Sequence, residues 1–406
     1  MSALAQLLHH TGWQVSGSDR EESPTTELLK SKGIEVRIGQ KAENVPASAD
    51  VVIYTEAAWE DNAERIQALS LGLPQKSYFE MLGEVSKGKR TIAIAGTHGK
   101  TTTTAMAARI LTEAGASPSA IIGSLVKDFD SNYLAGTSEW LIVEACEYKQ
   151  DFLTLDPEVL VVTNIEWDHT DYYADLKAVQ DAFRALMERA DIIVTNPSDR
   201  AIAPLLKNLS ARVVDYTHEP AYELTLPGEH NRMNARAAAA AARVAVPALT
   251  DAVVKRALGA FTGTWRRFEY KGKTARGAAV YDDYAHHPTA IAKTLAEFKK
   301  MPHGTLYVAF HPHLFSRTRD LLSGFAKAFK DADRVLIAPI YAARETDDGT
   351  MSNAVLARKI EESGTDAKPA DFTEIRHFFE TEPADGDIVV TMGAGDIYKV
   401  ADELVA

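Results

Sequence analysis

The hydrophobic and polar positions in residues 1–88 follow first a helical period and then a strand-like one. Apolar side chains recur at helical spacing before the turn at Thr11 and Gly12: Ala3, Leu4, Leu7 and Leu8. A short strand at 13–16, a helix at 24–32 and a strand at 50–55 follow. This alternation predicts part of a parallel sheet with crossover helices.

Residues 89–263 repeat this alternation with longer apolar runs. Strands are predicted at 90–95, 139–144, 159–163 and 191–196, and helices at 102–114, 176–189 and 234–246. Two of these strands, at 139–144 and 159–163, are runs of Val, Ile and Leu, as expected for strands that are buried on both faces. The last helix is rich in alanine and is favoured by intrinsic propensity.

The pattern in residues 264–406 predicts a third block of alternating strands and helices. Each of its strands leads directly into a polar cluster. The predicted strands are 278–281, 305–310, 334–340 and 387–391. The polar clusters that follow them are, in the same order, 282–284, 311–313, 341–345 and 393–396. Ligands of open α/β sheets bind beyond the carboxyl ends of the strands. Four such clusters favour a binding site, although polar loops that only turn the chain are the alternative. We expect an α/β protein with three domains, at 1–88, 89–263 and 264–406.

The composition narrows the class of protein. The formal net charge of −13 argues against a general grip on nucleic acid or on an anionic membrane surface, but not against a local basic pocket for a nucleotide. The single cysteine, Cys146, excludes a disulfide framework within the chain, which fits a reducing cytoplasm. Since the sequence has no signal-peptide start and no run of about 18 apolar residues, we expect a cytoplasmic protein without membrane insertion.

The strongest local signal is the segment AIAGTHGKTTTT at 93–104. An apolar strand leads into a turn bracketed by Gly96 and Gly99, and Lys100, Thr101 and a predicted helix follow. Glycines let backbone N–H groups converge on phosphate oxygens, and the helix N-terminus adds partial positive charge. Lys100 would neutralise phosphate charge, and the Thr101 hydroxyl would hold Mg²⁺. The usual loop has four residues between its glycines, so this is a shortened variant; a glycine turn that only caps a helix is the alternative.

Two polar residues follow neighbouring strands of the central block. Glu144 ends one predicted strand, and His169 lies just past the next. Together with Thr101, side chains at adjacent strand ends are able to share one Mg²⁺. On local grounds alone His169 is more often an ordinary loop histidine, whereas the phosphate loop and Glu144 favour a metal ligand.

The segment GEHNRMN at 228–234 precedes the alanine-rich helix. Asn231 and Asn234 lie one helical turn apart, and their amides are able to read an adenine edge. Helix capping by asparagine explains them equally well, so both interpretations stay open.

Eight motifs resemble, in their order along the chain, those of the Mur ligase family. They are GTHGKTTTT, EACEY, TNIEWDHTDYY, PGEHNRMNARAA, RRFEYKG, YDDYAHHPTAI, FHPHLFSRT and TMGAGDIY. The resemblance covers nearly the whole chain, and YDDYAHHP and FHPHLFSRT are much more specific than the phosphate loop. It implies an N-terminal Rossmann-like domain for a UDP-sugar, a central P-loop ATPase domain and a C-terminal Rossmann-like domain on the amino-acid side.

The resemblance also implies roles for individual residues. Those that bind ATP would be Gly96, Thr97, His98, Gly99, Lys100, Thr101, Thr102, Asn231, Asn234, Arg267 and Asp283. Those on the substrate side would be Ser18, Asp19, His286, His287, His313 and Arg317. Mg²⁺ would be held by Thr101, Glu144 and His169, and the catalytic residues would be Lys100, Glu144, His169 and Arg317.

The implied activity is ATP-dependent C–N bond formation in peptidoglycan synthesis, and thus in cell-wall biogenesis, cell shape and cell division. The lactyl carboxylate of UDP-N-acetylmuramate would attack the γ-phosphate of ATP, and L-alanine would attack the resulting acyl phosphate. Mg²⁺, Lys100 and arginines would spread the negative charge, and closure of the C-terminal domain would exclude water. The sequence leaves open the oligomeric state and the preference among L-alanine, glycine and L-serine.

The sequence departs from the family pattern at three places. Relatives carry a strand and a glycine-rich loop before the position of Met1, so we expect a misassigned start or an incomplete sequence, and weak UDP binding if the chain does begin here. Cys146 stands where this branch has an acidic residue, and we expect it to be a buried, inert thiol. The segment 217–227 is much shorter than in most relatives, which predicts missing edge strands in the central domain.

Three other functions remain open. A ligase that recycles a ready-made peptide onto the same sugar nucleotide shares Tyr148, although such relatives usually carry additional residues after that segment. A nucleotide-binding protein without ligase activity would fit the missing glycine loop, but not the retained Lys100, Glu144, His169 and Arg317. A generic phosphate-loop kinase or GTPase would not explain YDDYAHHP.

Overall fold

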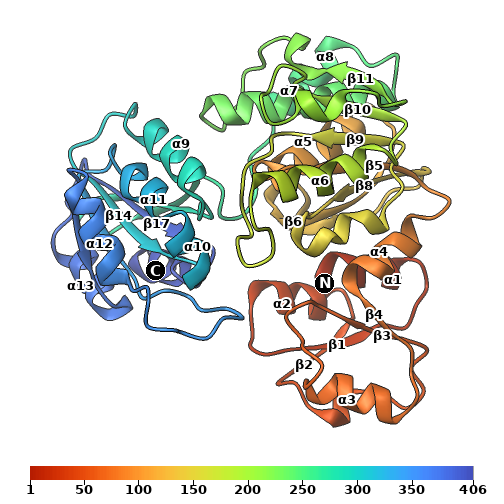
Figure 1. Cartoon of the computed structure of the whole chain (residues 1–406), viewed down its shortest axis with the longest axis horizontal. Helices are drawn as coiled ribbons and strands as arrows, with labels where there is room; N and C mark the ends of the chain where they lie inside the picture. Colours follow the sequence, from red (N-terminus) through yellow and green to blue (C-terminus); the bar gives the residue numbers. More distant parts are fainter. Residues whose placement is uncertain (406) are drawn as a thin grey trace. The chain divides into compact units, whose positions relative to one another are not determined.

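The computed structural model describes residues 1–405, which form two compact units. The first unit comprises Met1–Glu166, Lys177–Leu224 and Arg232–Thr262. The second comprises Trp167–Leu176, Thr225–Asn231 and the residues from 263 onward. Figure 1 colours the chain along its sequence, so the elements of each unit can be followed there. Two short segments from the middle of the sequence therefore pack with the C-terminal residues.

The first unit is built on a sheet of mostly parallel strands. Within the described residues the strand order is β11-β10-β9-β5-β8-β6-β7, and β7 alone is antiparallel to its neighbour. The bounds are β5 Arg90–Ala95, β6 Ser119–Val126, β7 Ser131–Leu134, β8 Trp140–Glu144, β9 Val159–Val162, β10 Ile192–Thr195 and β11 Arg212–Asp215. β5, β8 and β9 are buried along almost their whole length, which explains their continuous apolar sequences.

Helices cover this sheet. α5 (Lys100–Glu113) packs against β6 and β8, and α8 (Asp251–Gly259) packs against α5. The other helices of this region of the sequence are α6 (Leu176–Met187) and α7 (Glu229–Ala245). Short 3₁₀ helices complete the first unit: η1 Ala42–Asn44, η2 Lys127–Phe129, η3 Tyr148–Thr154, η4 Ala203–Leu206 and η5 Tyr216–His218.

The N-terminal part of the first unit holds two separate pairs of parallel strands. β1 (Ser16–Asp19) pairs with β2 (Glu35–Ile38), and β3 (Val52–Tyr54) pairs with β4 (Gln75–Ser77). Its helices are α1 Ser2–His10, α2 Pro24–Ser31, α3 Ala63–Ser70 and α4 Tyr78–Ser86. The strand predicted at 13–16 is wrong by three residues, because strand pairing begins only at Ser16, and Trp13 is 42% exposed in the connection before it.

The second unit contains a sheet in which five neighbouring strands are parallel. Within the described residues the order is β12-β13-β17-β14-β15-β16, and β12 is antiparallel to β13. The bounds are β12 Glu269–Lys273, β13 Ala279–Asp283, β14 Leu306–His311, β15 Arg334–Ile337, β16 Asp366–Pro369 and β17 Ile388–Gly393. After β16 the chain returns and forms β17 between β13 and β14. The order of the strands therefore reverses beside β14 and β17, and sheets of this kind bind ligands at such a point.

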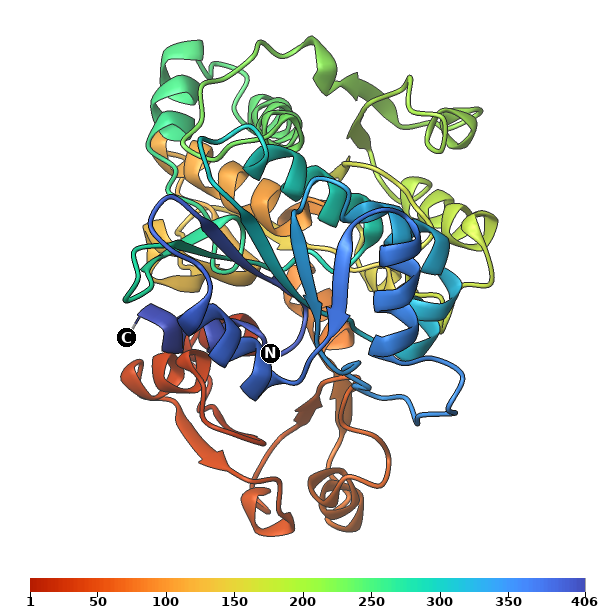
Figure 2. The same ribbon diagram turned by 90° about the vertical axis from the view of Figure 1, so that its left-hand side faces the viewer.

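Two apolar cores fill the faces of this sheet. One contains residues of α9 (Pro288–Phe298), α11 (Leu322–Ala328) and α12 (Asn353–Glu362), and the other contains residues of α13 (Phe372–Thr381) and α14 (Tyr398–Val405). The short α10 (Phe315–Asp320) follows β14. Figure 2 shows the strands of this sheet side by side, with helices flanking them. Among residues 1–405, no helix is both long and apolar enough to span a bilayer.

Candidate functional site

The phosphate loop joins β5 to α5, and its two glycines adopt positive φ angles. φ is +135° at Gly96 and +85° at Gly99, a region that residues with a Cβ rarely adopt. A Cβ at Gly96 would overlap the Thr163 hydroxyl, and one at Gly99 would overlap the Asn234 carboxamide. The glycines therefore allow a close approach of the loop to its neighbours. α5 begins directly after Gly99, at Lys100, two residues earlier than predicted.

The loop backbone is held by the residues that follow β9. Thr97 N donates to the Asn164 carbonyl at 3.0 Å, and His98 N donates to Asn164 Oδ1 at 2.9 Å. The Thr163 hydroxyl and the Asn164 amide both donate to the His98 carbonyl, at 2.7 and 2.9 Å. Sequence reasoning missed Thr163 and Asn164. The available signal was a polar Thr-Asn pair directly after a buried strand.

Lys100 folds back onto its own loop and onto a buried carboxylate. Its Nζ donates to the carbonyls of Gly96 and Thr97, and to both oxygens of Glu147 at 3.1 and 2.9 Å. Burial opposes the charged form, but nearby negative charge, chiefly that of Glu147, raises the pKa of Lys100, so the side chain is a cation. Glu147 is 2% exposed, and sequence reasoning did not assign it to the site.

Thr101 and Glu144 meet at the carboxyl edge of the sheet. Thr101 Oγ1 donates to Glu144 Oε1 at 3.0 Å, and Gly123 N donates to Glu144 Oε2 at 2.8 Å. Neighbouring ligands of an octahedral Mg²⁺, with bonds of about 2.1 Å, lie about 3 Å apart, so this pair of oxygens fits one ion. His169 belongs to the second unit, and its share in a metal site stays a prediction.

The remaining central residues predicted to bind ATP lie on α5 and α7. Thr102 is buried in the first turn of α5, and Asn234 on α7 lies against Gly99. Asn231, also on α7, donates from Nδ2 to the Pro227 carbonyl at 2.6 Å. This bond ties the start of the helix to the preceding loop. Contact of either amide with an adenine ring stays a prediction.

Arg267 and Asp283 lie in the second unit. The Arg267 guanidinium carbon is 4.9 Å from the centre of the Tyr284 ring. The Asp283 carboxylate accepts hydrogen bonds from the backbone N–H groups of Phe268 and Ala285, at 2.7 and 2.8 Å. Asp283 therefore links the loop that precedes β12 to the loop that follows β13. Contact of these two residues with ATP stays a prediction.

Arg317 is the centre of a buried group of charges in the second unit. It is 2% exposed, its Nε lies 2.8 Å from Asp168 Oδ1, and its Nη1 lies 2.9 Å from His313 Nδ1. Burial alone would raise the pKa of Asp168, but Arg317 and nearby histidines hold it well below its usual range. Burial and the Arg317 charge lower the pKa of His313 to about 3, and they lower that of His286 strongly. Both histidines are therefore neutral at pH 7.

His286 and His287 follow β13 and use their rings to bind backbone atoms. His286 Nδ1 lies 3.0 Å from the Tyr284 carbonyl. His287 Nδ1 accepts from Thr289 N at 3.3 Å, which caps α9, and its Nε2 lies 3.3 Å from the Trp167 carbonyl. The structure thus brings His286, which follows β13, together with His313 and Arg317, which follow β14, although β17 lies between these two strands in the sheet. Their contact with a substrate stays a prediction.

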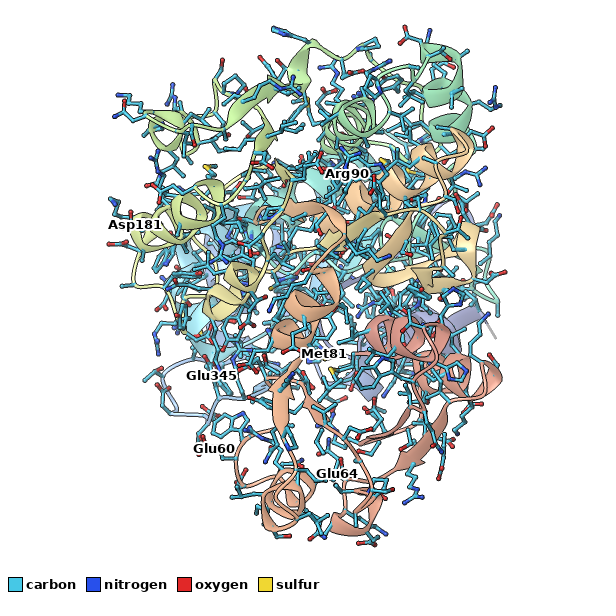
Figure 3. All side chains as sticks on the ribbon, turned by 90° about the vertical axis from the view of Figure 1, so that its right-hand side faces the viewer. Glu60, Glu64, Met81, Arg90, Asp181 and Glu345 are labelled. Atoms are coloured by element: carbon cyan, nitrogen blue, oxygen red, sulfur yellow. The ribbon has the colours of Figure 1, made fainter. Side chains whose placement is uncertain are left out.

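Ser18 and Asp19 end β1 in the N-terminal part of the first unit. Ser18 Oγ donates to Glu64 Oε2 at 2.8 Å, and Asn44 Nδ2 donates to Glu64 Oε1 at 2.7 Å. Figure 3 labels Glu64, which lies on α3. Asp19 Oδ1 accepts from Arg20 N at 2.7 Å. Glu64 therefore links the end of β1 to the neighbouring loop, and sequence reasoning missed it.

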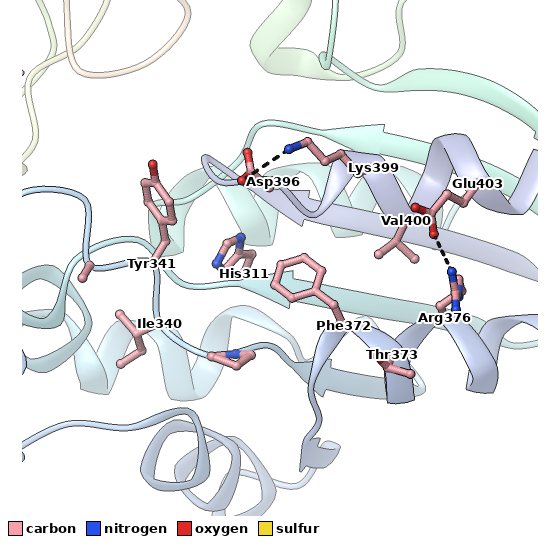
Figure 4. Close-up of a pocket in the computed structure, with 12 residues that line it drawn as sticks. His311, Ile340, Tyr341, Phe372, Thr373, Arg376, Asp396, Lys399, Val400 and Glu403 are labelled. Carbon is pink, nitrogen blue, oxygen red and sulfur yellow. Dashed lines mark hydrogen bonds and ion pairs between the residues drawn. The ribbon is translucent and has the colours of Figure 1, made fainter. Parts of the chain in front are cut away.

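A pocket of about 510 Å³ lies at the carboxyl ends of β14 and β17 (Figure 4). Its lining is His311, Pro339, Ile340, Tyr341, Ala342, Phe372, Thr373, Arg376, Asp396, Lys399, Val400 and Glu403. Two ion pairs lie in its wall, Arg376–Glu403 at 3.2 Å and Lys399–Asp396 at 3.7 Å. The cations and carboxylates of this wall are thus balanced, and none of the predicted site residues lines it.

Comparison with known proteins matches all three parts of the chain. Residues 1–90 match the family model "Mur ligase family, catalytic domain", residues 94–222 match "Mur ligase middle domain", and residues 266–395 match "Mur ligase, glutamate ligase domain". The UDP-N-acetylmuramate–L-alanine ligase of Clostridium novyi is 37% identical over 434 residues, which cover 99% of this chain and 94% of that protein.

Solved structures agree with this result. The UDP-N-acetylmuramate–alanine ligase of Thermotoga maritima matches with a TM-score of 0.81 and 27% identity, over 100% of this chain and 95% of that one. A murein peptide ligase from Psychrobacter arcticus matches with a TM-score of 0.75 and 23% identity, over 100% and 97%, and bears on the fold alone. The class that these matches define is an ATP-dependent ligase. The identity of 37% over nearly the full length goes further, and the chain belongs to the Mur ligase family.

Proposed function

We propose that this chain joins L-alanine to the lactyl carboxylate of UDP-N-acetylmuramate, with conversion of ATP to ADP and phosphate. The observation that carries the proposal is the 37% identity, over 99% of the chain, to ligases of that name. The phosphate loop supports it, because Lys100 is a buried cation at the start of α5, where triphosphates bind. The reaction would serve peptidoglycan synthesis in the cytoplasm.

The chemistry requires that two anions approach each other. The lactyl carboxylate attacks the γ-phosphorus of ATP, and the bond from that phosphorus to the β,γ-bridging oxygen breaks, which gives an acyl phosphate and ADP. The amino group of L-alanine then attacks the acyl carbon, inorganic phosphate leaves, and the nitrogen loses a proton. Lys100 and the N–H groups at the start of α5 would neutralise the triphosphate.

Oxygen ligands at the phosphate loop suit Mg²⁺. Thr101 and Glu144 would hold the ion, since their oxygens lie 3.0 Å apart, and His169 would supply a further ligand. When bound, the ion withdraws charge from the phosphate oxygens that develop negative charge in the transition state. Gly123 N, which donates to the second oxygen of Glu144, would fix the direction of that carboxylate.

The remaining residues are assigned by position. Asn231, Asn234, Arg267 and Asp283 would contact ATP, and Ser18, Asp19, His286, His287 and His313 would face the UDP-sugar or the amino acid. We further infer three functional domains, 1–88, 89–263 and 264–406, and the separate matches of residues 1–90, 94–222 and 266–395 to family models support this division.

The test is release of phosphate by the full chain with ATP, Mg²⁺ and UDP-N-acetylmuramate, with and without L-alanine. We expect release that requires both the sugar nucleotide and the amino acid. Free tripeptide in place of L-alanine is the control for a peptide-recycling ligase. Release with tripeptide alone would replace the proposed acceptor, and binding of ATP without any release under these conditions would contradict a ligase.

A further inference from the structure

The short segment that carries His169 is tied to the second unit by two ion pairs. Asp168 Oδ1 lies 2.8 Å from Arg317 Nε, and both side chains are buried, with 7% and 2% exposed. Three residues further on, Asp171 Oδ2 lies 2.8 and 2.5 Å from two nitrogens of Arg344. The ion pairs therefore hold the chain on both sides of His169.

One carboxylate oxygen of Asp168 contacts two different groups. Besides Arg317 Nε, Asp168 Oδ1 accepts a hydrogen bond from the backbone N–H of His169 at 2.7 Å. The φ angle of His169 is +51°, which a residue with a Cβ keeps only when its surroundings hold it there. The backbone conformation from which the imidazole projects thus depends on the Asp168 carboxylate, and the buried guanidinium of Arg317 fixes that carboxylate in turn.

We propose that Asp168 is a positioning residue for divalent-cation binding: it sets the backbone of His169 and thereby aims the imidazole at the ion. Arg317 acts through Asp168, whose carboxylate it contacts at 2.8 Å. The inference rests on the proposed function, in which His169 is a Mg²⁺ ligand. Residues that orient a metal ligand without touching the ion typically contribute about 10–100-fold to metal affinity. A purely structural ion pair would contribute stability alone.

The test compares the full chain with its Asp168→Asn variant in two measurements. The first is the Mg²⁺ concentration that gives half-maximal phosphate release. The second is the affinity for Mn²⁺ in the presence of ADP, measured by electron paramagnetic resonance, which does not need turnover. We expect both to weaken by about tenfold in the variant, while KM for UDP-N-acetylmuramate changes by less than about twofold.

Two variants separate positioning from stability. Asp282→Asn breaks an equally buried ion pair of the same unit, in which Asp282 Oδ2 lies 2.6 Å from Arg266 Nε. We expect a lower melting temperature with unchanged Mn²⁺ affinity. The double variant Asp168→Asn/Arg317→Gln no longer leaves a buried guanidinium unpaired, so we expect its melting temperature to recover in part. Its Mn²⁺ affinity should stay low, because the carboxylate is still missing.

The outcomes are distinct. If Asp168→Asn melts at a lower temperature but binds Mn²⁺ like the wild type, the positioning role is wrong. If the wild type releases no phosphate, the proposed function fails, and Mn²⁺ binding in the presence of ADP still decides the role of Asp168. Should Asp168→Asn not fold, Asp171→Asn takes its place, since its ion pair with Arg344 is more exposed. A smaller loss of Mn²⁺ affinity is then expected, since Asp171 holds only the far side of the segment, and an unchanged affinity would show that the ion pairs of this segment do not position His169.

Discussion

The ammonium group of Lys100 and the carboxylate of Glu147 form a buried ion pair, with Nζ 2.9 Å from Oε2. The positive charge of Lys100 is therefore balanced by the Glu147 carboxylate when no phosphate is bound. An incoming triphosphate competes with Glu147 for the same cation. This relationship leads to opposite predictions for the two residues.

Lys100→Ala should lower turnover by more than about a hundredfold, because one charge-stabilising donor typically contributes that much to the transition state. The measurement is phosphate release at saturating substrates. The control is Lys255→Ala, which removes an exposed lysine from α8. Circular dichroism verifies folding, since the variant removes the cation that lies 2.9 Å from the buried Glu147 carboxylate. Turnover near the wild-type value would refute the phosphate-loop assignment.

Glu147→Gln should bind ADP more tightly than the wild type does. Removal of the competing carboxylate frees Lys100 for phosphate, and a screened charge interaction at this distance corresponds to about 1 kcal/mol, or about fivefold in affinity. Isothermal titration with ADP measures the change. Glu139→Gln, on the surface near Arg90, is the control. Weaker binding by Glu147→Gln would mean that Glu147 orients the lysine instead of competing for it.

The sequence predicted the local geometry of the phosphate loop better than the contacts around it. Gly96, Gly99, Lys100 and Thr101 are read from a local pattern, because strand, glycine turn and helix start are consecutive. Glu147 holds Lys100 across 47 positions, and a long-range partner of this kind leaves no periodic signal. Arg317 was predicted as a site residue, but its contact with Asp168, 149 positions away, was not, for the same reason.

The fold shows the same division between local and distant information. β5, β8 and β9 were predicted because strands that are buried on both faces are continuous apolar runs. β2, β4, β7, β11, β12 and β16 were missed, because edge strands such as Glu35–Ile38 and Asp366–Pro369 are short and largely polar. β6 was also missed, although it lies inside its sheet. The strand order of each sheet depends on which distant segments pair, which periodicity does not encode.

Glu144→Ala should raise the Mg²⁺ concentration needed for half-maximal activity. Glu144 supplies one of two oxygens that lie 3.0 Å apart, and Thr101 alone is a weak ligand. The measurement is a Mg²⁺ titration of phosphate release, with Glu113→Ala on the same helix as Thr101 as control. An unchanged titration curve would remove Glu144 from the metal site.

Gly99→Ala should weaken ADP binding by more than about tenfold. The left-handed conformation costs a residue with a Cβ about 1–2 kcal/mol, and the added methyl group would also displace the Asn234 carboxamide. Gly115→Ala is a matched control, since φ is +76° there and no atom lies within 4 Å of the new Cβ. Both variants should lose the stability that the left-handed backbone costs an alanine, but only Gly99→Ala should lose ADP affinity. Equal affinities would contradict a role for the loop in binding.

The lowered pKa of His311 leads to a prediction of how the stability of the second unit depends on pH. Burial, opposed by Asp396, lowers the pKa of His311 to about 4, and its buried Nδ1 has no hydrogen-bond partner. The unfolded chain, with an ordinary histidine pKa of about 6.5, takes up a proton that the folded chain rejects, so stability falls as the pH decreases from about 6.5 toward 4. At pH 5 this loss is about 2 kcal/mol. Calorimetry at pH 7 and pH 5 should therefore show a smaller decrease in melting temperature for His311→Gln than for the wild type. Equal decreases would mean that His311 is protonated in the folded protein.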